Sequence, residues 1–125
     1  MADISSRSVL PQPPERRADV ATLTGEIDLA TAQALRTRLD ALTGGSGLDL
    51  ILDLRPVSFI DCAGLGVLCR VRNRVLARRG RLRLVSDSPS LRRVLRHAGL
   101  AGVFDVLPEM PEALAGALPE SSLVR

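Results

Sequence analysis

The sequence predicts a single α/β domain, in which helices pack on a β-sheet. At 125 residues, the chain has the length of one ordinary domain. Segments with strand patterns alternate with segments whose apolar residues recur at helical spacing, and most connections are too long for hairpins. The apolar fraction is 46%, with two Phe and no Trp or Tyr, so we expect an aliphatic core.

The first half of the chain is predicted to form a strand, a helix and a second strand. Residues 20–25 are β-rich and predict the first ordered strand, which a turn at residues 25–28 would close. Residues 29–43 are apolar at helical spacing, and the glycine-rich residues 44–47 would end this helix. Every second residue of 48–54 is leucine, which predicts a buried strand. The positions that carry these predictions are Leu35, Leu39, Leu42, Leu48, Leu50, Leu52 and Leu54, with Ile51 facing the other way.

A long amphipathic helix is predicted after the second strand. Residues 57–60 extend the chain past the interruption at Arg55–Pro56 and reach a turn at Asp61. The helix is predicted over 63–79, with Gly80 as the residue just beyond its end, the C′ position. Its inner side is predicted to carry Leu65, Leu68, Cys69, Val75 and Leu76.

The last third of the domain is predicted to add two strands and two helices. Residues 81–85 alternate leucine with arginine, as a strand does. Ser88–Pro89 is typical of an N-cap and first helical residue, and Gly99 would end that helix. A short strand at 103–107 and a short helix at 111–118 complete the predicted order.

The chain is expected to divide into an arm, a domain and a tail. Three prolines and scattered charges in residues 1–18 predict a flexible arm or an edge strand. Residues 19–118 would form the domain, and 119–125 are expected to fray. The first residues are polar and no apolar run is long enough to span a bilayer, so we expect a soluble, cytoplasmic protein.

A nucleic-acid surface is possible because seven arginines lie close together in residues 70–83, but nothing else in the sequence supports it. The net charge is +3 and every basic residue is arginine, with six arginines and nine acidic residues in residues 1–69 and eleven arginines and five acidic residues in residues 70–125. Aromatic stacking platforms and nucleic-acid motifs are missing, so no nucleic-acid partner is expected. Arg70, Arg74 and Arg78 fall on one face of the predicted helix, like a solvated stripe.

The turn at residues 61–66 is the strongest candidate for a functional site. It joins the end of an apolar segment to a helix, so Cys62 is expected to be exposed beside the positive end of the helix dipole. Asp61 is expected to cap that helix, and Gly64 and Gly66 to allow close packing of helix on strand.

Two other acidic residues allow two interpretations. Glu26 and Asp28 follow the first strand and are either solvated turn charges or part of the same exposed edge as Asp61.

Catalytic and metal chemistry find little support in the residues. A dinucleotide site would need a third glycine where Cys69 stands, and a phosphatase loop would need arginine at Leu68. A Cys62–His97 dyad is not excluded by spacing, although His97 falls on a predicted surface. Cys62 and Cys69 are two helical turns, about 10 Å, apart, too far for a disulfide, and no zinc pattern exists. We expect neither an enzyme nor a bound metal or cofactor.

An ordered set of motifs resembles the STAS domain family of anti-sigma factor antagonists, over roughly residues 19–118. The motifs are Gly25-Glu26-Ile27-Asp28, Leu52-Asp53-Leu54, the run from Val57 to Gly66, Gly80-x-Leu82-x-Leu84-Val85, Arg93-Val94-Leu95, Gly99-Leu100 and Phe104-Asp105-Val106. The resemblance implies a mixed sheet of four or five strands with helices packed mainly on one face. It also implies a bacterial regulator that binds an anti-sigma factor, usually of kinase-type ATPase fold, and so frees a sigma factor to regulate transcription. The sequence also leaves open whether this protein forms a homodimer.

The resemblance assigns a role to the turn. In regulated members of the family, the residue after the motif aspartate is a serine that the anti-sigma kinase phosphorylates, and Cys62 holds that position here. A thiol is not an ordinary substrate of a serine kinase, and Ala63 offers no hydroxyl. The partner-binding residues implied are Asp28, Asp61, Cys62, Ala63, Gly64 and Leu65.

The sequence leaves two regulatory hypotheses. The first is an antagonist that binds an anti-sigma factor without ordinary phosphorylation. The second is a sensing module that binds a small anion, nucleotide or lipid, or whose Cys62 is oxidised.

Overall fold

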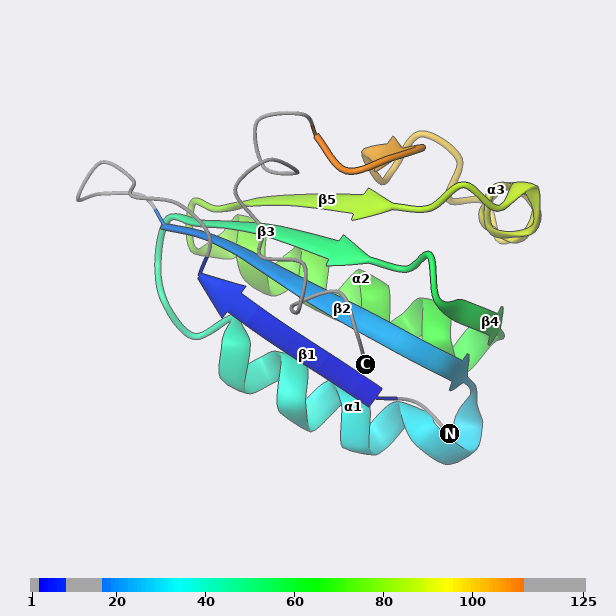
Figure 1. The fold of residues 1–125 in the computed structure, drawn as a ribbon, viewed down its shortest axis with the longest axis horizontal. Coiled ribbons are helices and arrows are strands. Elements are labelled where there is room, and N and C mark those ends of the chain that lie inside the picture. The colour runs from blue at the N-terminus through cyan, green and yellow to red at the C-terminus, as the bar shows by residue number, and fades with distance from the viewer. Residues whose placement is uncertain (1–2, 9–16, 112–125) are drawn as a thin grey trace.

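The computed structural model describes residues 3–8 and 17–111 (Figure 1). The predicted helix at 111–118 lies outside the described residues apart from Pro111, and so does the predicted tail. The described elements are β1 (Asp3–Ser8), β2 (Arg17–Ile27), α1 (Leu29–Leu42), β3 (Leu48–Asp53), β4 (Val57–Ile60), α2 (Cys62–Ala77), β5 (Arg81–Val85), α3 (Pro89–His97) and β6 (Val106–Leu107).

These elements confirm the α/β class and the mixed sheet. Six strands pair in the described part of the chain, in the order β1-β2-β3-β5-β6, with β4 added beside β2. β1 runs antiparallel to β2, and the other pairs are parallel. The count exceeds the expected four or five because residues 57–60, which were expected only to extend the chain after the second strand, form a separate strand that pairs with the end of β2.

The strand predicted at residues 20–25 corresponds to β2 and is longer than predicted. The prediction of a turn at residues 25–28 is wrong. The first half of β2 pairs with β3 and its last three residues pair with β4, so the chain stays extended as far as Ile27. Gly25 adopts a φ of 86° where the register with β4 shifts, so this glycine accommodates a bulge within a strand. The turn was predicted from the residues next to Gly25 alone. The chain stays extended because it pairs with β4, which lies about thirty residues away in the sequence.

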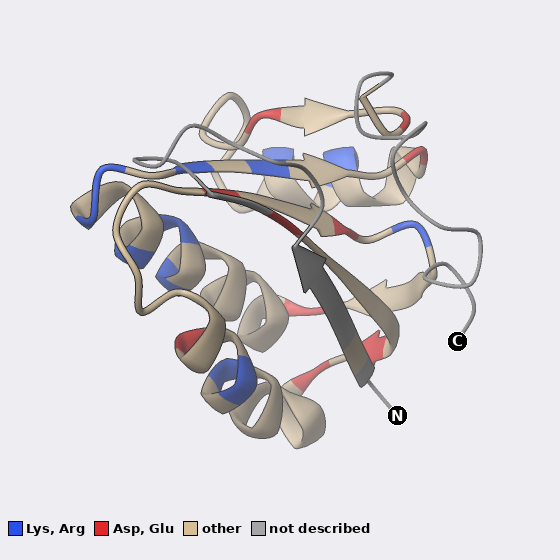
Figure 2. Ribbon diagram, turned by 60° about the vertical axis from the view of Figure 1, so that its left-hand side comes forward, with Lys and Arg blue, Asp and Glu red and all other residues tan. Residues whose placement is uncertain are grey.

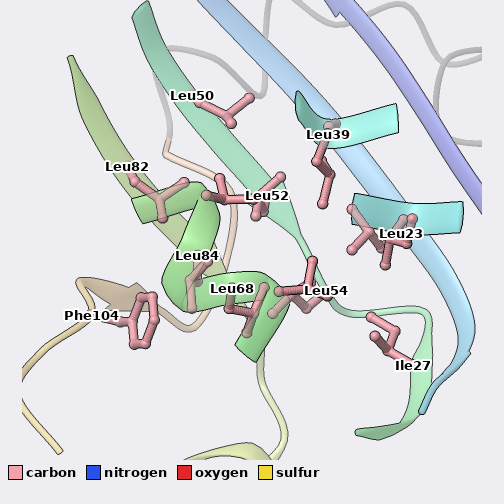
Figure 3. Close-up of a cluster of buried hydrophobic side chains, with 14 of the residues drawn as sticks. Leu23, Ile27, Leu39, Leu50, Leu52, Leu54, Leu68, Leu82, Leu84 and Phe104 are labelled. Carbon is pink, nitrogen blue, oxygen red and sulfur yellow. The ribbon is translucent and has the colours of Figure 1, made fainter. Parts of the chain in front are cut away.

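The helices pack on one face of the sheet, as expected. Figure 1 shows α1 and α2 behind the sheet and α3 at the end where the parallel strands finish. The leucines of β3 at 48, 50 and 52 meet the buried residues of all three helices in one cluster, part of which is drawn in Figure 3. Ile51 faces the other way, as predicted, and packs with Val20, Val85 and Met110.

The C-terminal end of α2 differs from the prediction. Leu76 is 46% exposed and does not belong to the inner side. Arg79, with a φ of 63°, and not Gly80, takes the left-handed position after the helix. The N–H groups of Gly80 and Arg79 donate to the carbonyls of Val75 and Leu76, a Schellman arrangement. Gly80 is needed for space, because a Cβ there would lie 2.4 Å from the carbonyl oxygen of Leu48.

The rest of the predicted order holds with one shortened element. Ser88 caps α3 and Pro89 is its first residue, and Gly99 follows its end with a φ of 77°. The last predicted strand, 103–107, is reduced to Val106–Leu107, because a turn occupies the residues before it.

Arg70 and Arg74 of the predicted arginine stripe do not simply face solvent. They bind the end of α1, and we call this set of contacts between the two helices the arginine tie. Arg70 donates to both carboxylate oxygens of Asp40 on α1, at 2.9 and 2.8 Å. Arg74 donates to the hydroxyl of Thr43 and to the carbonyl of Asp40, at 2.9 and 3.0 Å. These cations therefore stabilise the carboxyl end of α1, where the helix dipole is negative. The hydrogen bond from Arg70 lowers the pKa of Asp40, and the same contact raises the pKa of Arg70.

Candidate functional site

Two helix N-termini lie side by side at one end of the molecule. β2 and β4 are parallel neighbours in which Ile27 pairs with Ile60, and each strand leads directly into a helix. The next residues are Asp28 and Asp61, and the N–H of Asp61 donates to the carbonyl of Ile27 at 3.2 Å. The structure therefore brings together two acidic residues that are 33 positions apart in the sequence.

Both aspartates are N-caps. Oδ1 of Asp28 accepts from the N–H groups of Ala30 and Thr31 at 3.0 and 3.2 Å, and the Thr31 hydroxyl accepts from the N–H of Asp28 in return. Oδ1 of Asp61 accepts from the N–H of Gly64 at 3.1 Å, which confirms the predicted cap. Each cap contributes about 1 kcal/mol to helix stability. Each cap also fixes the residue at which its helix begins, and so fixes which residues of the first turn are exposed to solvent.

Gly64 is required by the close approach of α2 to the strand ends. A Cβ at this position would lie 2.6 Å from the carbonyl oxygen of Ile27 and 2.6 Å from Cγ1 of Ile60. The expected packing role of Gly64 is therefore confirmed. For Gly66 it is wrong, because a Cβ there would meet nothing within 4 Å.

The residues of the turn divide into an exposed set and a buried set. Cys62 is the first residue of α2 and is exposed, and Ala63 is half-buried. Gly64 and Leu65 are buried, and Leu65 packs in the main core, so its side chain supports the turn from inside. Of the predicted turn residues, Asp61, Cys62 and Ala63 are the ones with side chains open to a partner.

Two exposed apolar residues that were not predicted from the sequence flank this site. Leu29, the first residue of α1, is 81% exposed, and Phe59 on β4 is 52% exposed. In the described part of the chain, Leu76 is the other large apolar side chain that is exposed, and it lies near the far end of α2. A signal existed for Leu29, since it falls off the face that carries Leu35 and Leu39. None existed for Phe59, because its exposure depends on the place of β4 in the sheet.

A shallow groove opens beside Cys62, between the N-terminal halves of α1 and α2. Its volume is about 420 Å³. Leu29 and Ala32 line it from α1, and Ala63 and Gly66 from α2. The absence of a side chain at Gly66 therefore keeps this groove open.

The helix N-termini at one end of the groove are acidic, whereas Arg36 and Arg70 line the groove farther along α1 and α2. Glu26 is exposed at the end of β2, and Asp28 and Asp61 are half-buried caps. Figure 2 shows acidic segments gathered where α1 and α2 begin, with basic segments farther along both helices. The second interpretation of Glu26 and Asp28, as part of one edge with Asp61, therefore describes the structure.

The described residues form neither the Cys62–His97 dyad nor a metal site. No hydrogen bond among residues 3–8 and 17–111 joins Cys62 to His97, which lies exposed at the end of α3. Within the same ranges, no group of three His, Cys, Asp or Glu side chains could hold a metal ion. Both cysteines are free, as predicted. None of the helices in the described part of the chain is long and apolar enough to cross a membrane.

Known proteins are similar to this chain in sequence and in fold. The anti-sigma-B factor antagonist of Bacillus subtilis is 36% identical over 84 residues, which cover 67% of this chain and 76% of that protein. The crystal structure of an anti-sigma factor antagonist from Mycobacterium paratuberculosis is similar with a TM-score of 0.68 at 27% identity, covering 90% of this chain and 94% of that one. The Bacillus cell fate determinant SpoIIAA in its phosphorylated form shares the fold, with a TM-score of 0.58 at 23% identity over 86% of this chain and 96% of that one.

The family follows from these comparisons together with the paired helix N-termini. The family model described as "STAS domain" matches residues 14–113, which is most of the chain and includes the whole site. This chain belongs to the STAS domain family.

Proposed function

We propose that this protein is an anti-sigma factor antagonist, which binds an anti-sigma factor of kinase-type ATPase fold and so releases a sigma factor. The observation that carries the proposal is the exposed Cys62 at the N-terminus of α2, with Leu29 exposed at the N-terminus of the neighbouring α1 and Phe59 exposed two residues before the Asp61 cap. Relatives named as antagonists of anti-sigma factors support the same role. This role is regulatory, and it requires no catalytic group of the chain.

The residues of this surface indicate which groups the partner should present to it. Exposed apolar side chains such as Leu29 and Phe59 are typical anchors of protein interfaces, and the groove of about 420 Å³ beside Leu29 can accept a side chain of the partner. The acidic residues Glu26, Asp28 and Asp61 at the helix N-termini favour a basic patch on the part of the partner that docks there. We expect binding to weaken as salt concentration rises.

Cys62 changes how this surface is regulated. A phosphate at the first residue of α2 would add a charge of about −1.5 to −2 beside two carboxylates and oppose a partner that docks on them. Because Cys62 and Ala63 carry no hydroxyl, we propose that the complex forms without phosphorylation at this turn.

The test compares the parent protein with Cys62→Ser. Each is incubated with candidate anti-sigma kinases and ATP, and followed by intact mass and by complex formation. We expect both proteins to bind the same kinase, and only the serine variant to gain a phosphate. Phosphorylation of the parent protein would contradict the proposed role of Cys62, and failure of both proteins to bind any candidate would contradict the antagonist role.

Leucines at the two ends of the helices offer a matched control for the docking surface. We expect Leu29→Asp to weaken the complex at least tenfold, about 1.4 kcal/mol, because it places a charge in the apolar contact. Leu76→Asp makes the same change at an exposed leucine far from the site and should leave the affinity unchanged. Equal effects of the two variants, measured by titration calorimetry, would place the interface elsewhere.

The second candidate function is redox sensing. It is favoured by the exposure of Cys62 at a helix N-terminus, a place where thiols tend to be reactive. Cys69 lies half-buried in the middle of the same helix and serves as an internal reference. A sensor requires Cys62 to react with iodoacetamide at pH 7 faster than free cysteine does, and a rate no greater than that of free cysteine would exclude this function.

A further inference from the structure

A second groove runs between β4 and α3, on the other side of β4 from the helix N-termini. Its volume is about 320 Å³, near the lower end of the roughly 300–1,000 Å³ that is typical of small-molecule sites. Phe59 and Ile60 line it from β4, and Leu91 and Val94 line it from α3. These walls are apolar and would bury a short hydrocarbon chain.

The helical spacing of α3 divides its surface into three parts. Leu91 and Leu95 enter the core, and Arg92 and Arg96 face away from this groove toward another hollow beside β6. The third part faces the groove and carries Ser90, Arg93, Val94 and His97. The groove thus has apolar walls with a cationic rim along one side.

Two polar groups in the groove have unused hydrogen-bonding capacity. The Ser86 side chain is only 3% exposed, and its hydroxyl oxygen accepts from the N–H of Ser88 at 3.2 Å. Within the described ranges, the proton of that hydroxyl has no acceptor, so it is available to a molecule in the groove. Arg93 likewise has no ion-pair partner among the described residues. A buried donor and an unpaired cation favour an occupant that accepts hydrogen bonds and carries negative charge.

We infer that the β4–α3 groove binds a medium-chain alkyl carboxylate. The alkyl chain lies against Phe59, Ile60 and Val94, and Arg93 neutralises the carboxylate. A single guanidinium on this rim matches a singly charged head, and the modest volume favours a medium-length chain over a long one. This site is separate from the turn at Cys62, and the inference does not depend on the proposed antagonist role.

The probe is octanoate, titrated into the whole protein labelled with ¹⁵N and followed by NMR. We expect saturable shift changes on β4 and α3. 1-Octanol, which has the chain without the charge, should bind at least fivefold more weakly, and acetate, which has the charge without the chain, should show no saturation. No saturable change with octanoate up to millimolar concentration, or changes confined to other elements, would overturn the inference.

Two pairs of variants test the parts of the site separately. Arg93→Gln should weaken octanoate about tenfold, as loss of a charge-assisted hydrogen bond does, and leave octanol unchanged. Arg92→Gln removes the neighbouring cation that faces away and should change neither. Val94→Trp fills the groove and should abolish binding of both probes, whereas Leu76→Trp should have no effect. Equal effects of Arg92→Gln and Arg93→Gln would show general charge attraction and overturn the assigned site.

Discussion

At the scale of single residues, two glycines two positions apart in α2 have opposite roles. Gly64 lies against the ends of β2 and β4, whereas Gly66 faces open space beside the groove between α1 and α2. The same motif thus contains one glycine required by packing and one that the fold does not need. A sequence shows both as glycine, and only the neighbouring backbone distinguishes them.

These glycines give the first prediction. Gly64→Ala should destabilise the domain by about 1–3 kcal/mol, because its methyl group would overlap the carbonyl of Ile27. Gly66→Ala should stabilise it by about 0.5–1 kcal/mol, because alanine is the better helix former and nothing obstructs its Cβ. Urea unfolding of the two variants measures both signs. A stable Gly64→Ala protein would contradict the close approach of α2 to the strands.

At the scale of elements, α1 and α2 are held together by charge as well as by apolar packing. Asp40 near the end of α1 accepts from Arg70 and pairs with Arg74, 3.4 Å away. The Arg70 hydrogen bond keeps the pKa of Asp40 below its ordinary value. A carboxylate with a lowered pKa in the folded state stabilises that state above its unfolded pKa of about 3.9 and loses this effect as the pH falls through the folded pKa.

The arginine tie predicts that the effect of replacing Asp40 on the free energy of unfolding depends on pH. Asp40→Asn should lower the free energy of unfolding at pH 7, and its difference from the parent should shrink as the pH falls below about 4. Asp87→Asn, a change at an exposed carboxylate outside the tie, is the control and should have little effect at either pH. Urea unfolding at pH 7 and pH 3 makes the comparison. A difference that stays constant across this range would show that the charge of Asp40 is irrelevant.

At the scale of the whole molecule, β3 is the centre on which the other elements assemble. It pairs with β2 on one side and β5 on the other, and its leucines contact the layer of helices. Leu52 has no solvent exposure and lies within the cluster drawn in Figure 3. The helix N-termini keep their positions only while this sheet is intact.

The central position of Leu52 predicts a large and cooperative effect. Leu52→Ala should destabilise the domain by about 2–5 kcal/mol, through lost burial and a residual cavity. Leu52→Asp should abolish the cooperative transition, because an unpaired charge cannot be buried in an aliphatic core. Leu76→Ala, at an exposed site, should stay within about 0.5 kcal/mol of the parent. Circular dichroism during urea unfolding distinguishes these outcomes.

The proposed docking surface and the β4–α3 groove share Phe59, which predicts coupling between the two sites. Phe59 belongs to the proposed docking surface and also lines the β4–α3 groove. Octanoate in that groove should therefore change the affinity for the anti-sigma partner, and by linkage the partner should change the affinity for octanoate by the same factor. Calorimetric titrations of each ligand with and without the other measure the two factors. A factor of one for both ligands would contradict the predicted coupling.

The sequence predicted the features that depend on neighbouring residues. Three predictions of this kind agree with the structure, because each depends on residues that are close in the sequence. They are the helical spacing of Leu35 and Leu39, the alternating leucines of β3, and the start of α3 at Ser88–Pro89. The Asp61 cap was predictable for the same reason, since its partner Gly64 lies three residues away. Features that rest on distant residues were missed or misread, such as the extension of β2 through Gly25 and the arginine tie to Asp40.

By itself, then, the sequence determined the α/β class, the order of the main elements, the family and the candidate turn at Cys62. Only the tertiary structure placed Asp28 beside Asp61, left Leu29 and Phe59 exposed, and opened the groove between β4 and α3. The physical reason is the pairing of β4 with the end of β2, a contact between segments about thirty residues apart that no local pattern specifies. That pairing puts two helix N-termini on one surface and makes the site.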